Sequence, residues 1–481
     1  MNEHHATPKW RDGLLISLLA LVAYLLCGRF AWHGLDSIAF LNQYSLGGTV
    51  TEPPWHTFYM PLLHVGHDLV TPFGGGAYRG GLLISAAGTA IGVWFTHAAA
   101  RALGVNRATA IYAALLVATM PATTYFAVVV EVPGVVLAFS GWTWLCIAHW
   151  ARKPGLGTAV LAGVSLAVAY LAHPTAAFVG LTMLPIYQLA QPVPRWRPLL
   201  FGTAAALAVL LIGMLLLPHL VNALGGSSNG SGKALEFLRN RSSKAHARGF
   251  TRILVDEWLV PFLPIHLPLL TMLLRRGSRL VVAGCLVAAL PFVLASWLLL
   301  VEQECEHGAY ATAICGPLAI AVAMHVRSHW WRALSLALGS ATSIVLGIGL
   351  QETSQALATA SAVESSVRGR DLRWLIADGA GPDGRVWLTR YPNCKPTLLA
   401  YLLQNQPEKL AANLDALDAM IAAHATAGGV SIVTSNTLEE LANVAPLFPP
   451  ARIIEDWLLA HRGPALGHAD GVEVFAVQSH N

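Results

Sequence analysis

Two acidic residues stand beside long apolar segments of this chain, where a carboxylate often lines a polar cavity. Asp36 follows the first apolar run, and Glu131 lies between two later ones. A carboxylate within hydrogen-bonding reach of a hydroxyl can take its proton as a general base, so both residues are candidate catalytic groups. Each has a simpler explanation as well: Asp36 can cap a short helix, and Glu131 can be a solvated loop acid.

A cationic segment follows the apolar run that ends near residue 221. Between Asn222 and Val255, a glycine- and serine-rich stretch leads into a series of basic residues. The segment contains a single acid, Glu236. The basic residues are Lys233, Arg239, Arg241, Lys244, Arg248 and Arg252. Arg and Lys bind phosphate through charge-assisted hydrogen bonds, so this segment is a candidate site for the phosphate of a lipid carrier. Attraction to ordinary anionic lipid headgroups explains the same composition equally well.

Three candidates for substrate binding lie between the first and second apolar runs. Glu52, His56 and Tyr59 are spread among prolines and aromatic residues, a composition that suits helices lying in the membrane interface. His56 can orient Asp36 or contact a substrate. The alternative is that an aromatic-rich segment holds this histidine for packing alone.

A later loop adds two more binding candidates, His307 and Tyr310, after the acids Glu302, Glu304 and Glu306. Carboxylates with imidazole suit a divalent metal, and alternate residues of an extended loop share a face. In a helix the same residues would fan out, and a solvated acidic loop explains them without a ligand. We therefore assign no metal site and no certain cofactor, and a divalent metal ion stays an open alternative.

The composition places these residues in a membrane protein. Of 481 residues, 55% are hydrophobic and 12% are charged, whereas soluble domains carry about 25% charged residues. Several uncharged stretches are long enough to cross a hydrocarbon core of about 30 Å as a helix, which excludes a wholly soluble enzyme. We predict about eleven spans, near residues 14–31, 81–100, 109–128, 132–151, 156–173, 175–192, 199–221, 257–274, 280–301, 309–326 and 333–351.

Basic residues mark alternate short loops, from Lys9 and Arg11 at the start to Arg327 and Arg332 near the end. By the positive-inside rule these loops face the cytoplasm. We therefore expect a multi-pass protein of the cytoplasmic (inner) membrane with its N-terminus in the cytoplasm. The acidic loops then face outward, and an odd number of spans leaves the C-terminus outside as well.

The break between two of these spans falls at Pro174. The uncharged run 154–194 is about twice the length of a span, and a proline interrupts helical hydrogen bonding. The turn of a hairpin is expected there, and the neighbouring His173 is interpreted as a helix-end residue.

From about residue 360 the composition becomes that of a soluble domain. Apolar runs with strand character occur at 385–389, 430–434 and 472–477, and 396–427 has helical periodicity. A small α/β domain is expected, with no recognisable catalytic motif.

We accordingly divide the chain at this change of composition. A transmembrane domain of residues 1–355 contains loop one at 32–78 and the basic outward loop at 222–255, and an extracytoplasmic α/β domain covers 360–481. Cys305 and Cys394 lie outside the apolar segments and can form a disulfide if both are in an oxidising compartment.

The order of motifs in the first half of the chain carries a family resemblance. Asp36-Ser37 follows the first span, Pro53-Pro54 precede His56, and Val130-Glu131-Val132 precedes another apolar span. This order resembles the GT-C superfamily of polytopic glycosyltransferases, most closely its protein O-mannosyltransferase-like branch, although there the histidine precedes the prolines. The likeness covers about residues 14–190. It implies a GT-C-like helical membrane fold, with the loop-one acid, Asp36, as general base.

The resemblance and the residues together predict a membrane glycosyltransferase. It would transfer a sugar from a polyprenyl-phosphate-linked donor to an acceptor hydroxyl at the outer face of the cytoplasmic membrane, with inversion at the anomeric carbon. The expected partners are the lipid-linked donor, membrane lipid, and an acceptor protein, lipid or glycan, and no nucleic acid.

Two alternatives stay open. A polytopic transporter or flippase of a lipid-linked or glycan substrate would bury ionisable residues at mid-membrane and often show repeated halves, signals that this sequence lacks. A non-catalytic assembly or sensor protein, working through its C-terminal domain, is the second.

Overall fold

The computed structural model describes residues 11–28, 40–41, 44, 56, 58–191, 195–223, 250–299, 308–349, 354–367, 369–377, 381–391, 394–404, 409–446 and 448–479. The chain divides into two compact units. The first comprises Met1–Ala31, Gly47–Val70 and Arg79–Leu350, and the second comprises Trp32–Leu46, Thr71–Tyr78 and Gln351–Asn481.

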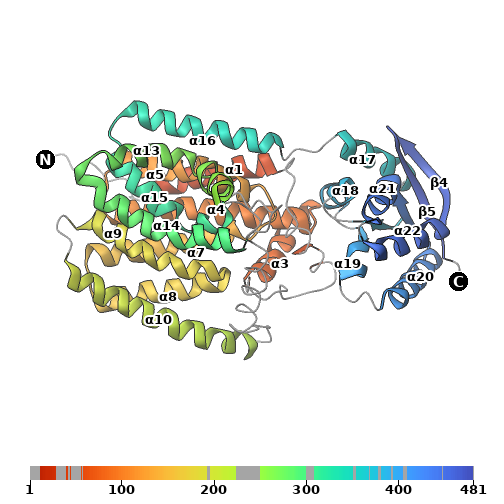
Figure 1. Cartoon of the computed structure of the whole chain (residues 1–481), viewed down its shortest axis with the longest axis horizontal. Helices are drawn as coiled ribbons and strands as arrows, with labels where there is room; N and C mark the ends of the chain where they lie inside the picture. The colour runs from red at the N-terminus through yellow and green to blue at the C-terminus, as the bar shows by residue number, and fades with distance from the viewer. Residues whose placement is uncertain are drawn as a thin grey trace. The chain divides into compact units, whose positions relative to one another are not determined.

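The first unit is built from helices (Figure 1). Three of its short segments, η2, η5 and η6, are 3-10 helices, and η4 is a π-helix. The elements are α1 (Arg11–Gly28), α3 (Tyr59–Val70), α4 (Ala77–Ala102), α5 (Arg107–Thr119), α6 (Pro121–Ala127), α7 (Pro133–Arg152), α8 (Leu156–Ala172), η2 (Pro174–Thr182), α9 (Met183–Ala190), α10 (Trp196–Ala223), α12 (Phe250–Leu254), η4 (Val255–Leu259), α13 (Leu263–Leu273), η5 (Arg276–Ser278), α14 (Arg279–Leu299), η6 (Ala309–Ile314), α15 (Cys315–His325) and α16 (His329–Gly349).

Helical segments overlap all the predicted spans, but they differ in length. Within the described ranges, five helices are long and apolar enough to cross a membrane: α1, α4, α7, α10 and α14. The number rises to seven if each of two bent pairs, α5 with α6 and α12–η4 with α13, is one span. The segments 156–172, 174–190 and 309–325 are apolar but shorter. The chain is thus a multi-pass helical protein by length and composition.

Helices α4 and α7 approach each other closely through glycines. A side chain on Gly88 would lie 2.6 Å from the backbone oxygen of Gly134, and one on Gly134 would lie 2.5 Å from that of Ser85. Small residues at such positions let helix backbones pack directly, which is the usual way that membrane helices associate. The same contact holds Ser85 beside the segment that precedes α7.

Several helices begin at prolines. Pro121 begins α6 after a bend of 61° from α5, Pro133 begins α7, and Pro174 begins η2. A proline at the first helical position fixes the backbone and needs no hydrogen-bonding partner for its missing N–H. Short non-helical segments lie at these breaks, among them the largely buried one that carries Glu131.

The second unit contains a five-stranded sheet with the order β2-β1-β3-β5-β4. Strand β1 pairs parallel with β2 and β3, whereas β5 pairs antiparallel with β3 and β4. The elements are η1 (Thr71–Phe73), α17 (Ser354–Val367), β1 (Leu372–Ile376), α18 (Pro382–Arg390), β2 (Lys395–Leu398), α19 (Leu399–Gln404), α20 (Leu410–Thr426), β3 (Val430–Thr434), α21 (Ser435–Val444), α22 (Pro449–His461), β4 (Arg462–Ala469) and β5 (Val472–Val477).

Two of the three strands expected here are present, as β3 and β5, and the prediction of the third is wrong. Residues 385–389 belong to the helix α18, which Pro382 begins at its first position. The helical stretch expected at 396–427 is divided into β2, α19 and α20.

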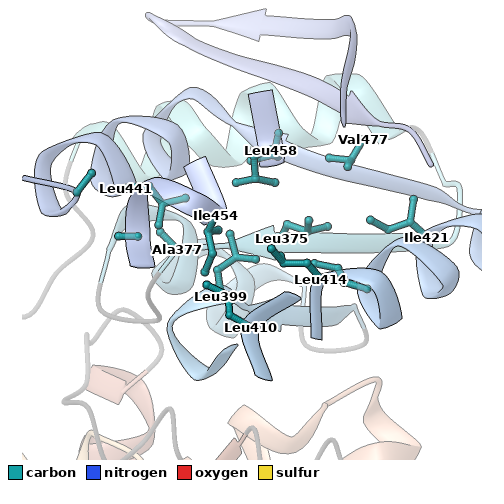
Figure 2. Close-up of a cluster of buried hydrophobic side chains, with 14 residues drawn as sticks. Leu375, Ala377, Leu399, Leu410, Leu414, Ile421, Leu441, Ile454, Leu458 and Val477 are labelled. Carbon is teal, nitrogen blue, oxygen red and sulfur yellow. The ribbon is translucent and has the colours of Figure 1, made fainter. Parts of the chain in front are cut away.

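The core of the second unit lies between the sheet and helices packed on it. Figure 2 shows Leu375 from β1 surrounded by Leu414 of α20 and Ile454 and Leu458 of α22, all fully or almost fully buried. Strand β1 is buried along nearly its whole length, as expected for a strand with parallel neighbours on both sides.

Candidate active site

A short turn of loop one, with His56, Phe58 and Tyr59, lies against helices α7 and α8. The Tyr59 N–H donates to the His56 carbonyl oxygen over 2.9 Å, which closes the turn at the start of α3. Phe58 stacks on Phe139 of α7, with ring centroids 5.2 Å apart. His56 stacks on His173, with centroids 5.0 Å apart. Aromatic contacts on both sides therefore hold this turn against the helix ends.

His56 lies in a place where a positive charge is unfavourable. Its Nδ1 atom is inaccessible to solvent. Burial lowers the pKa of His56 to about 4, against a hydrogen bond with the Ala172 backbone that acts in the opposite direction. At neutral pH the imidazole is therefore uncharged, which suits hydrogen bonding to a substrate rather than pairing with a phosphate charge.

His173 joins this turn to a third segment. It ends α8, its Nδ1 atom accepts a hydrogen bond from the Thr175 N–H over 3.2 Å, and it lies 2.6 Å from the Thr175 hydroxyl. Its interpretation as a helix-end residue agrees with this geometry. Its ring also faces Tyr310 of η6, with centroids 6.0 Å apart. His56, His173 and Tyr310 thus form a row of three rings drawn from distant parts of the sequence.

Glu131 lies near Tyr59 of the same turn. Its N–H and carbonyl oxygen both hydrogen-bond to the Ser85 hydroxyl of α4, over 3.1 Å and 3.0 Å. One carboxylate oxygen accepts the N–H of Val132, at the start of α7, where the helix dipole favours a negative charge. Burial raises the pKa of Tyr59 well above its ordinary value, and the charge of Glu131 raises it further. The phenol therefore stays protonated and can donate a hydrogen bond.

A second acid, Glu257, supports the segment that carries Tyr310. It is fully buried in the π-helix η4, and its carboxylate accepts the N–H of Gly308 over 2.9 Å. Gly308 has φ +82°, and a side chain there would lie 2.7 Å from the Phe262 ring. This position requires glycine, because the backbone is left-handed and pressed against its neighbours. π-Helical turns occur frequently at functional sites.

Four of the residues predicted from the sequence come together here. His56, Tyr59, Glu131 and Tyr310 belong to one cluster of polar groups within an apolar bundle. Seven others lie outside the described residues: Asp36, Glu52, Lys233, Arg239, Arg241, Arg248 and His307. The Glu302–Glu306 acids also lie outside them, and no group of three His, Cys, Asp or Glu side chains in the described ranges could hold a metal ion.

Two residues in or next to the cluster, Glu257 and His173, have no catalytic or binding role predicted from the sequence. Glu257 fell at the edge of a predicted span, where a charged residue is itself a signal of a polar interior. His173 was assigned only to a helix end, since nothing in the linear sequence indicates its contact with His56. The thiol of Cys394 lies 3.1 Å from the Leu372 carbonyl oxygen as a free cysteine, and Cys305 lies outside the described residues.

Solved structures with a similar fold were found, although no family model matches the sequence and no curated protein matches it significantly. ArnT from Cupriavidus metallidurans bound to undecaprenyl phosphate superimposes with a TM-score of 0.58 at 13% identity, covering 96% of this chain and 97% of that one. Its apo state gives a TM-score of 0.54 at 14% identity, with the same coverage. ArnT is a GT-C glycosyltransferase.

The chain therefore shares the fold of ArnT. An oligosaccharyltransferase from Archaeoglobus fulgidus, solved with zinc and sulfate, is also similar, with a TM-score of 0.45 at 13% identity over 96% of this chain and 73% of that one. The similarity to ArnT covers 96% of this chain, so the shared fold extends well beyond the 14–190 region of the sequence resemblance.

Proposed function

We propose that this protein transfers a sugar from a polyprenyl-phosphate-linked donor to an acceptor hydroxyl at the outer face of the cytoplasmic membrane. The supporting observation is the polar cluster of His56, His173, Tyr310, Tyr59 and Glu131 within a GT-C fold. A polar cluster of this kind, built from loop one and helix ends, suits binding of a hydrophilic group by a protein otherwise solvated by lipid. The ArnT structure bound to undecaprenyl phosphate supports a lipid-linked donor.

The proposed reaction is a single displacement. The acceptor oxygen attacks the anomeric carbon, and the bond from that carbon to the phosphate oxygen breaks. Asp36 takes the hydroxyl proton, and the polyprenyl phosphate leaves with the bonding electron pair, which inverts the anomeric configuration. The basic loop, through Lys233, Arg239, Arg241 and Arg248, is proposed to stabilise the negative charge on the departing phosphate.

The remaining candidates would bind the sugar and the acceptor. Neutral His56 and protonated Tyr59 offer hydrogen bonds without a net charge, and Tyr310 adds an aromatic face, all of which suit a sugar. Glu131 is the second candidate catalytic carboxylate, and Glu52 and His307 complete the proposed binding residues. We place the chain nearest the O-mannosyltransferase-like branch on the order of its Asp36-Ser37 and Glu131 motifs.

A transfer assay with membranes containing the full-length protein tests the assignment of the base. Asp36→Asn should lower the rate of sugar transfer from a labelled polyprenyl-phosphate sugar by about 100-fold or more, since general bases contribute 10²–10⁴. Asp68→Asn is the matched control, because Asp68 is an 82% exposed acid of the same loop. Full activity of the Asp36→Asn protein would refute Asp36 as the base.

The same membranes distinguish the transferase from a flippase. A transferase forms a new glycosidic bond, whereas a flippase moves the intact labelled lipid across a vesicle bilayer without releasing polyprenyl phosphate. Lipid movement with no release of polyprenyl phosphate would contradict the proposed function.

A further inference from the structure

A second feature of the helical unit lies away from the candidate active site, where the ends of α7, α8 and α10 meet. A cavity of about 210 Å³ opens there between the first turns of α8 and α10. Its lining is apolar, apart from backbone, and includes Trp150, Leu156, Ala159, Phe201, Gly202 and Ala205. An apolar lining of this kind favours an apolar occupant.

Close packing of Trp150 shapes the floor of the cavity. A side chain on Gly202 would lie 2.3 Å from the Trp150 ring, so glycine lets α10 approach the indole directly. Trp150 is 1% exposed, whereas Leu156 and Phe201 at the mouth are 73% and 76% exposed. The cavity therefore opens outward on a strongly apolar surface, of the kind that acyl chains cover.

Positive charges border the mouth of the cavity. Lys153 directly precedes the lining residue Pro154, Arg197 directly precedes the lining residue Pro198, and Arg195 lies two positions earlier. All three are exposed, and the stretches 152–158 and 191–198 contain no acid. No ion pair within the described ranges neutralises them. An apolar cavity with an unpaired cationic rim matches a molecule that has an anionic head and an apolar tail.

The neighbouring Trp196 indicates the depth at which this rim lies. Tryptophan residues of membrane proteins concentrate at the headgroup level, and Trp196 is 65% exposed at the first position of α10. Phe201 follows five residues later, about 8 Å deeper at 1.5 Å per residue. The cations are thus at headgroup depth, and the cavity is at the depth of the upper acyl chain.

The cavity is separate from the candidate active site. Helix α8 runs from Leu156, at the cavity, to Ala172, next to His173. Its 17 residues span about 25 Å, close to the thickness of the hydrocarbon core. With α8 crossing the membrane as the sequence predicts, the two sites belong to opposite leaflets, and the predicted orientation puts the cavity in the cytoplasmic one, where anionic lipids collect.

We propose that this cavity is a binding site for an anionic glycerophospholipid. The lipid phosphate pairs with Lys153 and Arg197, with Arg195 adding to the positive field, and the first part of one acyl chain enters the cavity over Trp150. The lipid is bound as a structural partner of the helical unit, and it is distinct from the polyprenyl carrier, which the proposed function places at the outer face.

Native mass spectrometry of the full-length protein in detergent, with equal amounts of phosphatidylglycerol and phosphatidylcholine, measures this binding. Selective retention of phosphatidylglycerol is expected. The double variant Lys153→Gln with Arg197→Gln should bind it roughly 30-fold more weakly, since each basic residue near the surface is worth about 1 kcal/mol. The matched control, Arg11→Gln with Arg327→Gln, removes two exposed cations that do not border the cavity and should retain the lipid.

A second variant tests the cavity rather than the charge. Ala205→Phe places a ring in the cavity while keeping every cation, and it should also weaken retention of phosphatidylglycerol. Equal retention of both lipids by the unaltered protein would overturn the proposal. So would equal losses in the double variant and its control, or wild-type retention in Ala205→Phe, because either result shows general attraction to basic loops. Unchanged melting temperatures in detergent without lipid establish that the variants are folded.

Discussion

At the scale of single residues, the buried carboxylate of Glu257 is the group on which the position of Tyr310 depends. Replacing it by alanine leaves the buried Gly308 N–H without its acceptor, which costs about 1–3 kcal/mol. We expect Glu257→Ala to lower the melting temperature and to lower sugar transfer by about tenfold to a hundredfold, because the displaced turn carries Tyr310. Glu257→Gln keeps an acceptor oxygen and should be milder.

The neighbouring Asp256 supplies the control for this experiment. It pairs with Arg252 over 3.4 Å at a partly exposed position, and Asp256→Asn should change neither the melting temperature nor sugar transfer much. If Glu257→Ala behaved like Asp256→Asn in the transfer assay, Glu257 would have no positioning role.

The pKa of His56 gives the site a pH dependence with a definite sign. An unfolded histidine has a pKa near 6.5, and burial lowers that of His56 to about 4. Between these values the unfolded chain binds more protons than the folded one, so stability falls as the pH is lowered from about 6.5 towards 4. His56→Gln cannot titrate, and its melting temperature should fall by several degrees less than that of the wild type over this window.

Melting curves at half-unit pH steps measure the difference. His67→Gln serves as the control, since it removes a histidine of α3 in the same loop outside the ring stack of His56 and His173. Identical pH profiles for the wild type and His56→Gln would show that the loop-one turn does not hold a neutral histidine.

At the scale of elements, the contact between α4 and α7 decides where Glu131 lies. Gly88→Ala adds a methyl group 2.6 Å from the Gly134 oxygen, and overpacking of this kind typically costs 1–3 kcal/mol. The helices must separate, which moves Ser85 away from Glu131. We expect a lower melting temperature and lower sugar transfer.

Gly157→Ala in α8 is the matched substitution, because its added methyl group meets no atom within 4 Å. Alanine also favours a helix by up to about 1 kcal/mol over glycine, so this variant should be neutral or slightly stabilising. Equal stabilities of the two alanine variants would contradict the close approach of α4 and α7.

In the second unit, one buried carboxylate ties together the ends of several elements. Asp383 of α18 accepts hydrogen bonds from the hydroxyls of Thr434 and Thr437, the latter over 2.7 Å, and from the Asn436 amide over 3.1 Å. Burial raises the pKa of Asp383 despite these donors. Asp383→Ala leaves the donors unpaired and should destabilise this unit by about 3 kcal/mol, with a smaller loss for Asp383→Asn.

Hydrogen exchange of the full-length protein, followed on peptides from β3 and α21, localises this loss. Asp415→Ala, at an exposed position of α20, is the control and should leave exchange unchanged. Faster exchange confined to other regions in Asp383→Ala would argue against the hydrogen-bond network.

The helices and strands also show which structural features can be predicted from sequence patterns. Long apolar runs identified helical segments well, because lipid leaves a backbone few alternatives to a helix. The strand predicted at 385–389 is wrong, because periodicity cannot separate a short strand from a short buried helix and Pro382 begins a helix here. In the candidate site, loop-one composition predicts a binding role for His56, but its contact with His173 joins residues 117 positions apart and leaves no local signal.

At the scale of the whole molecule, sidedness links the fold to the proposed chemistry. The basic short loops predict a cytoplasmic N-terminus, and an odd number of spans predicts an outward C-terminus. A fluorescent reporter inserted after Lys153 should therefore fluoresce in the cytoplasm, while alkaline phosphatase fused after Asn481 should be active outside. A third fusion at Asp68 should also be active outside, since loop one carries the proposed base. Cytoplasmic fluorescence from a reporter at Asp68 would put Asp36 on the side away from an outward acceptor, and the transfer reaction proposed here would then have no base.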